Sequence, residues 1–561
     1  MQLSEGAGTR KAFAAGGALY NAALILMEIH VTTFILGRRF LASVAVLLPL
    51  ASLAAAQAQT NGSPDVTLDS AQRIIALAVD DNAVDGRTVR VALRSLKDPT
   101  LAPLFEALAK SSDPGTRLDA SVALVMATKE PKWLSVSAMM ETKDDARIGA
   151  VIAMLIDAEV LTTPQLEEIV KATGVDPAHA VMAASELLRR KALPDHAILL
   201  KQLDRTSDGA GRYDMVRHYS AITLLENKND AENAAALKSL KEMAATHVAR
   251  LEPVQELMLL RVFKDKLTLA LPWVQSLAQD AKCTPRLRQT AIATLLSLHD
   301  PLGGDALKDL IDARKDVGDQ LSFGLTAIEF ADQLKPAQIS GLGLSTGGQA
   351  LGSPLLKAVS DLARKAVAGE DITSGLMTLV KQGQPIVANW ALGYASSAPA
   401  ARKLAIRVAI IEQASIVDDV RGADLERAAI AAHRVVDDCG DEGRKELGRM
   451  LKDTNRAAAE AILAGMYRAN ATNLSPLVTP IWEDLQKSAA SEIAANYAAL
   501  LLAREGSKEP LKWLAGMIQG GTVQNIGFRA MAGWQYAKLK DQGPALIGRI
   551  VAGMGKKEAS K

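Results

Sequence analysis

The chain is 561 residues long, 49% hydrophobic and 23% charged, which supplies enough apolar material for large cores and excludes an intrinsically disordered protein. Its 64 basic and 63 acidic residues leave a net charge of +1, which excludes the global basic field that attracts nucleic acid or anionic lipid. Cys283 and Cys439 lie outside any CxxC motif, which excludes a disulfide framework, a zinc ribbon and a haem attachment site. We expect both thiols to be free.

Residues 1–58 are predicted to form an N-terminal extension followed by an export signal. An apolar run extends from Phe40 to Ala56, and the small residues Ala56 and Ala58 suit a signal peptidase. We therefore expect cleavage after Ala58 and a periplasmic or secreted protein. The alternative is an uncleaved membrane anchor, because a run of about 17 apolar residues lies at the lower limit for crossing a bilayer.

Two further features concern the start of this segment and its export route. Met27 would begin a signal of ordinary length, so we expect the true start there. Arg38 and Arg39 precede the apolar run and loosely resemble a twin-arginine signal, but paired arginines are also common in general secretory signals. The export route is therefore left open between these two.

Beyond the signal, the pattern predicts amphipathic helices of about 12 to 18 residues, separated by short turns rich in Pro, Gly, Asp and Asn. The clearest unit opens at Asp113-Pro114, where Asp can cap the helix and Pro suits its first turn. Ala120, Ala123 and Leu124 then fall on one helix face. No segment alternates convincingly between apolar and polar residues, so we expect an all-α protein.

The same kind of opening recurs along the chain and predicts a repeat. Similar helix openings occur at Asp144, Asp176 and Pro285. If the position of Arg117 is used as a marker, the first eight markers lie about 27 to 39 residues apart, which suits one antiparallel helix pair per repeat. The marker positions are Arg90, Arg117, Arg147, Ala180, Arg217, Glu256, Arg288, Gln320, Arg402, Arg427, Arg456 and Arg529.

A Pro-Trp pattern marks the second helix of some pairs. It occurs as Pro131-Lys132-Trp133, as Pro510-Leu511-Lys512-Trp513 and, more loosely, as Pro272-Trp273. Each copy predicts Pro at the start of the second helix and Trp on its first inward turn, as a core anchor rather than a platform for sugars. Trp390 and Tyr394 are also expected to share one helix face and to lie in the core.

The Asp-Pro-x-x-Arg-x-x-Ala-x-x-x-Leu pattern, repeated over about 480 residues, resembles the HEAT-repeat family. The resemblance implies an armadillo-like α-solenoid, a right-handed superhelix of about a dozen stacked antiparallel helix pairs. Such a superhelix commonly holds partners on its concave surface, and the resemblance carries no catalytic residues across. Ala180, Glu256 and Gln320 depart from the pattern at the Arg position, which leaves the repeat boundaries open. We expect the marker arginines to form a ladder with Asp residues of neighbouring turns.

A Gly-rich segment, residues 336–354, interrupts the predicted array. So many glycines disfavour a packed helix, so we expect a loop or hinge there. It would separate an N-terminal HEAT-like array, residues 59–335, from a C-terminal HEAT-like array, residues 355–555. Residues 556–561 form a short basic tail.

The Gly-rich segment contains a formal GxSxG motif. Ser345 stands between Gly343 and Gly347, but a nucleophile elbow needs a strand before the serine and a helix after it. The preceding residues pass through Pro336 and form no strand pattern, and no Asp and His partners can be nominated. A flexible loop is therefore favoured over a catalytic serine, and without a Walker lysine the glycines are not a phosphate-binding loop either.

Possible metal ligands gather near one predicted helix end. His433 and Asp437 are four residues apart on a helix, and Asp438, Cys439, Asp441 and Glu442 follow. A solvated helix end that stops at Gly440 explains these residues more simply. Residues 81–86 resemble the start of a calcium loop, but Ala92 stands where the bidentate carboxylate is required. We assign no catalytic, cofactor-binding or metal-ligating residue and expect no cofactor.

These features favour a non-enzymatic exported scaffold that binds a protein or peptide partner on its concave face. They indicate no nucleic-acid partner and no stable membrane span after signal cleavage. The main alternative is a helical-repeat hydrolase or lyase, with its chemistry at the Gly-rich segment or near His433. A glycan- or peptide-binding envelope protein is the other alternative, and it would need exposed aromatic residues on the concave face.

Overall fold

The computed structural model describes residues 64–80, 83–172, 176–205, 212–227, 229–246, 251–416, 422–453, 456–469, 472–487, 492–520 and 525–559. The extension and export signal predicted for residues 1–58 lie outside these ranges, so the cleavage after Ala58 and the choice of export route stay predictions. Within the described ranges, we find no helix with the length and apolar character needed to cross a membrane.

The prediction of an all-α fold is confirmed. The described residues form 28 α-helices that pack in neighbouring pairs as an α-solenoid, and these residues contain no strand. A single isolated bridge joins Leu344 to Ala350.

The helices before residue 250 are α2 (Pro64–Ala76), α3 (Gly86–Ser95), α4 (Ala102–Leu108), α5 (Pro114–Thr128), α6 (Val136–Met140), α7 (Asp145–Asp157), α8 (Thr163–Lys171), α9 (Pro177–Arg189), α10 (Ala197–Leu203), α11 (Arg212–Leu225) and α12 (Asp230–Ala245). Those from residue 252 to 416 are α13 (Glu252–Asp265), α14 (Leu271–Gln279), α15 (Pro285–Ser297), α16 (Leu302–Ala313), α17 (Val317–Glu329), α18 (Pro354–Val367), α19 (Thr373–Lys381), α20 (Pro385–Ser397) and α21 (Ala400–Ile416). The last are α22 (Gly422–Asp438), α23 (Gly440–Asp453), α24 (Arg456–Arg468), α25 (Ser475–Lys487), α26 (Glu492–Arg504), α27 (Leu511–Gln519), α28 (Ile526–Leu539) and α29 (Gly543–Ala559).

The helix openings occur where the local sequence predicts them. The Asp113 carboxylate accepts the Thr116 N–H at 2.6 Å at the start of α5, and Asp144 accepts the Arg147 N–H at 3.1 Å at the start of α7. Each such cap satisfies a backbone donor that the helix leaves open and contributes about 1 kcal/mol. α5 ends at Lys129, whose φ of 61° turns the chain out of the helix.

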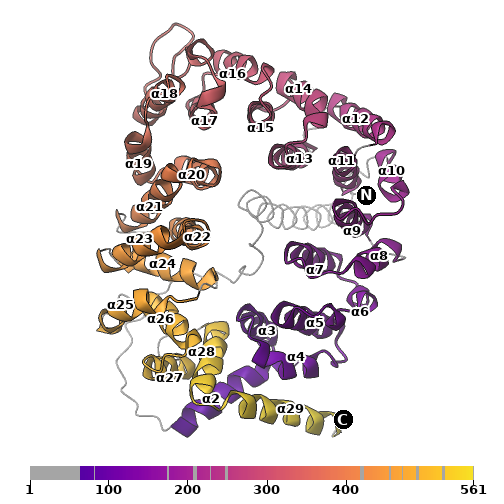
Figure 1. The fold of residues 1–561 in the computed structure, drawn as a ribbon, viewed down its shortest axis with the longest axis vertical. Coiled ribbons are helices and arrows are strands. Elements are labelled where there is room, and N and C mark those ends of the chain that lie inside the picture. Colours follow the sequence, from indigo (N-terminus) through magenta and orange to yellow (C-terminus); the bar gives the residue numbers. More distant parts are fainter. Residues whose placement is uncertain are drawn as a thin grey trace, which may run out of the picture. The chain divides into compact units, whose positions relative to one another are not determined.

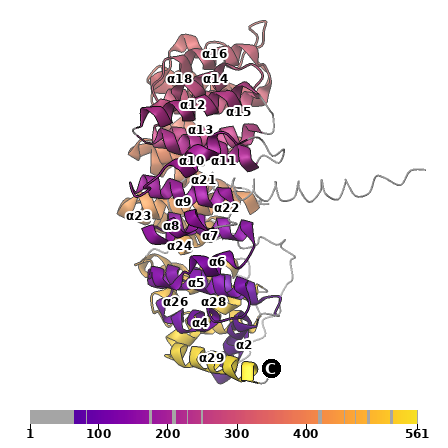
Figure 2. The same ribbon diagram turned by 90° about the vertical axis from the view of Figure 1, so that its right-hand side faces the viewer.

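The chain divides into two compact units. Unit 1 contains the described residues from Lys143 to Gly375 and is continuous in sequence. Its helices form two layers: successive odd-numbered helices from α7 to α17 contact one another, and so do the even-numbered helices α10, α12, α14 and α16 (Figure 1). In the side view this unit extends from α7 and α8 through α10 and α11 to α14 and α16 (Figure 2).

Unit 2 combines two segments that are distant in sequence, the described residues up to Thr142 and those from Leu376 onward. One of its layers consists of α20, α22, α24, α26 and α28, and this layer continues directly into α2 and α3. Gly533 on α28 permits the close approach, because a Cβ atom there would lie 3.1 Å from the Cβ of Ala71 on α2. The first described helix, α2, is therefore packed against α28, near the C-terminal end of the described chain.

A buried polar contact holds this junction of the two segments. Trp534 is fully buried, and its indole N–H donates to Asp98 at 2.9 Å. Lys538 donates to the same carboxylate at 2.7 Å. These interactions lower the pKa of Asp98 in spite of its desolvation. This grouping differs from the expected arrays, residues 59–335 and 355–555, because the helices before residue 142 pack with those of the C-terminal half.

The Gly-rich segment packs within unit 1. Leu342 is fully buried, and its carbonyl accepts a hydrogen bond from Arg364 of α18 at 2.6 Å. Gly343 has a φ of 76°, and its N–H donates to Gln320 of α17 at 2.8 Å. A Cβ atom at Gly343 would lie only 2.7 Å from the Ser360 hydroxyl, so glycine suits both the backbone conformation and the space. The segment connects α17 to α18 and contacts both.

Candidate functional site

Four of the marker arginines cap helix ends. Arginine side chains at the start of one helix donate to backbone carbonyls at or just beyond the C-terminal end of the preceding helix. The pairs are Arg90 to Ala78 at 3.0 Å, Arg117 to Ser111 at 2.8 Å, Arg288 to Ala278 at 3.1 Å and Arg529 to Ile518 at 2.9 Å. A helix leaves its last carbonyls without intrahelical donors and carries partial negative charge there, so a guanidinium is a favourable partner.

This arrangement corrects the predicted Arg–Asp ladder. Acidic partners occur as well: Arg90 lies 3.9 Å from Asp119, and Arg217 donates to Glu242 at 3.0 Å and to the Ser239 hydroxyl at 2.8 Å. Gln320, which departs from the Arg pattern, still donates to the Ile311 carbonyl at 2.8 Å at the end of α16. Gln320 therefore makes the same structural contact as these arginines, whereas Ala180 and Glu256 place no such donor at the marker position.

Ser345 lies in a turn between the two ends of the isolated bridge. Its N–H donates to the Gln349 carbonyl at 2.7 Å, and its hydroxyl accepts the Gln349 N–H at 3.2 Å. The next helix begins only at Pro354. The serine therefore lacks the strand-to-helix turn that exposes and strains a nucleophile.

The candidate metal ligands near His433 do not converge on one point: Asp437 pairs with His433, whereas Asp438 and Cys439 contact Arg407. The His433 imidazole is buried, with its Nε2 atom 3.0 Å from the Asp437 carboxylate. Arg407 of α21 is bonded to Asp438 at 2.6 Å and lies 3.4 Å from the Cys439 sulfur. No group of three or more His, Cys, Asp or Glu side chains with metal-binding geometry occurs among the described residues.

Both cysteines are free thiols, as expected. Burial raises the pKa of Cys283 to about 12, and the nearby Asp280 and Glu252 carboxylates act in the same direction. A thiol with this pKa remains protonated at neutral pH and is a poor nucleophile.

The tryptophans of the Pro-Trp pattern differ in how far their side chains are buried. Trp273 is fully buried in α14, which confirms the predicted anchor. Trp513 and Trp133 are half-buried, with Trp513 donating to Asn496 at 2.8 Å and Trp133 to Glu130 at 3.2 Å. Trp390 and Tyr394 share one helix face as predicted and stack with their ring centroids 5.0 Å apart.

A buried polar cluster in unit 1 was not predicted. Ser185 of α9 is bonded to Thr223 of α11 at 2.8 Å, and Arg261 of α13 donates to the Thr223 hydroxyl at 3.0 Å. Arg261 also pairs with Glu226, and burial raises the pKa of that carboxyl while Arg261 acts in the opposite direction. Ser185, Thr223 and Arg261 lie at equal sequence steps of 38, a regularity that could have identified the cluster.

Unit 2 has an aromatic cluster that crosses three helices of one layer. Tyr467 of α24, Tyr497 of α26 and Phe528 of α28 follow one another with centroid separations of 5.9 Å and 5.5 Å. Beside them, Arg468 forms a two-pronged ion pair with Glu426 at 2.6 Å and 2.8 Å. These side chains join successive helices of one layer, so their role is also structural.

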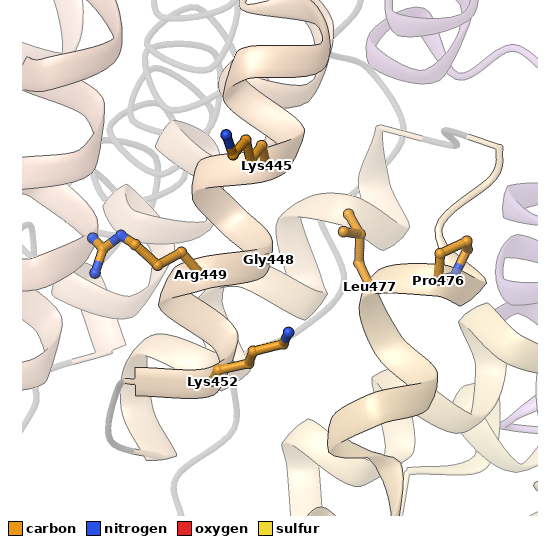
Figure 3. A pocket seen from close by; sticks show the side chains of 6 residues that line it. All are labelled: Lys445, Gly448, Arg449, Lys452, Pro476 and Leu477. Carbon is orange, nitrogen blue, oxygen red and sulfur yellow. The ribbon is translucent and has the colours of Figure 1, made fainter.

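A solvent-facing recess lies between α23 and α25 of unit 2. It has a volume of about 350 Å³ and is lined by Lys445, Gly448, Arg449, Lys452, Pro476 and Leu477. Figure 3 shows Pro476 and Leu477 on the helix that faces the other four, with Lys452 extending toward that helix and Lys445 and Arg449 extending away from it. We call this feature the α23–α25 recess.

The charges around the recess are not all equivalent. Arg449 is paired with Glu446 at 2.6 Å, and its hydrogen bonds hold the pKa of Glu446 below the usual value. Lys445 and Lys452 are exposed and have no ion pair within the described part of the chain. The recess therefore carries an excess of positive charge.

Gly448 forms the floor of the recess. A Cβ atom at Gly448 would lie 2.9 Å from a methyl group of Leu477, so the absence of a side chain lets α25 approach α23 closely. Leu477 is half-buried and Pro476 is exposed, so one wall of the recess is apolar. The recess is therefore open on one side, unlike an enclosed small-molecule pocket.

Comparison of the chain with protein-family models, with curated proteins and with solved structures finds no match.

Proposed function

We propose that this protein is an exported, HEAT-like scaffold that binds another protein on the surface of its helix stack and performs no chemistry itself. The observation that supports the proposal is the distribution of charge. The buried Arg261 and the half-buried Arg468 join neighbouring helices, whereas Lys445 and Lys452 are exposed beside a recess. Exposed charges beside a recess are available to a partner.

The relation to HEAT repeats is part of this proposal. Its support is the antiparallel pairing of helices, the Asp-Pro helix opening at α5, and the long donor side chains that Arg90, Arg117, Arg288, Gln320 and Arg529 provide to the preceding helix end. In such stacks each repeat contacts mainly its neighbours, so the outer surfaces of many helices stay available for binding.

The proposed location is the periplasm or the extracellular space, and it depends on the sequence features of residues 1–58. N-terminal sequencing of the protein purified from its native host tests this part. We expect mature protein that begins at Gln59 in the envelope or secreted fraction. An intact apolar segment in the membrane fraction would instead establish an anchored protein.

The test of the scaffold function is crosslinking capture in the native host. The full chain, with a C-terminal affinity tag, would be crosslinked in envelope and secreted fractions, and bound proteins identified by mass spectrometry. We expect one stoichiometric protein partner. A folded, monomeric bait that captures no partner above the level of an untagged control would contradict the proposal.

A further inference from the structure

We propose that the α23–α25 recess binds an acidic segment of the partner protein, with carboxylates at Lys445 and Lys452 and an apolar side chain against Leu477. This inference rests on the proposed scaffold function and specifies the chemistry of the partner.

The first argument is charge. Lys445 and Lys452 are seven residues apart on α23, which places them on the same helix face and about 10 Å apart along its axis. Within the described residues neither has an ion-pair partner, whereas the neighbouring Arg449 is neutralised by Glu446. These two lysines can each attract one carboxylate of a partner segment whose acidic side chains are also about 10 Å apart.

The second argument excludes a simple anion site at the start of α25. Glu505 of α26 accepts the backbone N–H groups of Leu474 and Ser475 at 2.7 Å and 2.8 Å, and the Ser475 hydroxyl at 2.5 Å. These bonds hold the pKa of Glu505 below its usual value, against its partial burial. Because a carboxylate of the protein already occupies the helix end, an incoming anion depends on the lysines.

The third argument is shape. Gly448 lies between the two lysines without a side chain, Leu477 packs onto it, and Leu477 and Pro476 form an apolar wall that faces α23. A free phosphate would use the charges but leave this wall exposed to water. A peptide with an apolar residue between two acidic residues would use both features and bury the wall.

The direct test measures peptide binding to the purified full chain. The probe is a fluorescein-labelled helical peptide with two glutamates seven positions apart and a leucine between them, and binding is followed by fluorescence anisotropy at several salt concentrations. We expect the double variant Lys445→Glu/Lys452→Glu to weaken binding at least about tenfold, because it replaces two attractions by two repulsions.

Matched controls separate local from global charge effects. Lys512→Glu/Lys540→Glu changes the net charge equally at exposed lysines of α27 and the end of α28, and it should bind like the unmodified chain. A second peptide, with both glutamates replaced by glutamine, should lose most of the binding. Circular dichroism of both double variants would verify that the helices remain folded.

Several outcomes would overturn the inference. Equal binding by the recess variant and the unmodified chain would place the peptide elsewhere, and equal loss in both double variants would show a nonspecific charge effect. Lysine-dependent binding to phosphatidylglycerol vesicles without binding to the peptide would identify a lipid surface instead.

The capture experiment distinguishes the failure of this inference from the failure of the scaffold function. A partner captured equally by Lys445→Glu/Lys452→Glu and by the unmodified chain would leave the scaffold function in place and remove the recess from it. Peptide binding without any captured partner would retain the acidic chemistry of the recess and contradict the scaffold function.

Discussion

The two units of this protein are built from similar helix pairs but are assembled differently. Unit 1 forms from one continuous segment, so most of its contacts join helices that are close in sequence. Unit 2 requires α28, near the C-terminus, to pack on α2 and α3, near the start of the described chain. Because closing a long loop has an entropic cost before the contact forms, we expect this junction of unit 2 to form late in folding.

The buried contacts of the two units also differ in kind. Unit 1 joins α9, α11 and α13 through hydroxyl groups and an Arg261–Glu226 pair, whereas unit 2 joins α24, α26 and α28 mainly through aromatic rings. A buried ion pair loses much of its value when one partner is removed, and an aromatic stack is insensitive to pH. Substitutions in the two units can therefore test separate sources of stability.

The largest effect is expected at the junction in unit 2. Trp534→Ala should lower the free energy of unfolding by about 4 kcal/mol, because it leaves a cavity in a fully buried site and removes the donor to Asp98. Denaturant unfolding followed by circular dichroism measures this. Trp133→Ala, at a half-buried tryptophan, is the control and should cost markedly less. Equal losses would show that the junction adds no more than an ordinary half-buried contact.

The next effect concerns the charged cluster of unit 1. Arg261→Ala should destabilise the protein by about 3 kcal/mol, because it removes a buried arginine and leaves the half-buried Glu226 without its cation. Arg286→Ala removes an exposed arginine paired with Glu256 and should cost less than about 1 kcal/mol. If the two variants unfold at the same denaturant concentration, the Arg261 pair contributes no more than a surface pair.

A pH dependence should arise from His218 in unit 1. Burial lowers the pKa of this histidine from 6.5 to about 4, and the nearby Arg217 acts in the same direction, against Asp214. The neutral imidazole is thus favoured in the folded state, so its contribution is fully present above about pH 6.5 and is lost as the pH falls toward 4. The shift corresponds to about 3 kcal/mol.

Unfolding midpoints between neutral pH and pH 4.5 measure this slope. His218→Gln should flatten the slope, while His299→Gln, at an exposed histidine of the same unit, should leave it unchanged. An unchanged slope in His218→Gln would assign the acid sensitivity to other groups.

The smallest of these effects is expected at Asp98. Asp98→Ala should cost about 2 kcal/mol, because it removes the cap to Thr100 and leaves the Trp534 N–H without its acceptor. Combined with Trp534→Ala, the loss should be less than the sum of the single losses, since both remove the same contact. A double-mutant cycle measures this coupling, and strict additivity would contradict a shared contact.

Local chemistry made much of the architecture predictable. Asp113-Pro114 and Asp144 open helices because their side chains satisfy free N–H groups within the next turn, and the apolar spacing of Ala120 and Leu124 defines a buried face. The spacing of the markers predicted paired helices, because about 27 to 39 residues is the length of one antiparallel helix pair with its turns. The acceptors of the arginines were not predictable, because the carbonyl that each one reaches belongs to another helix.

The sequence by itself determined the helical class, the helix openings and the free state of Cys283 and Cys439, because each depends on neighbouring residues or on simple counts. The packing of α28 on α2 and the approach of Leu477 to Gly448 were decided only in the tertiary structure. A glycine in a helix has the same local pattern whether it faces solvent or another helix. Whether such a glycine faces solvent or a second helix depends on which surface packs against it, and the residue spacing within one helix does not specify that surface.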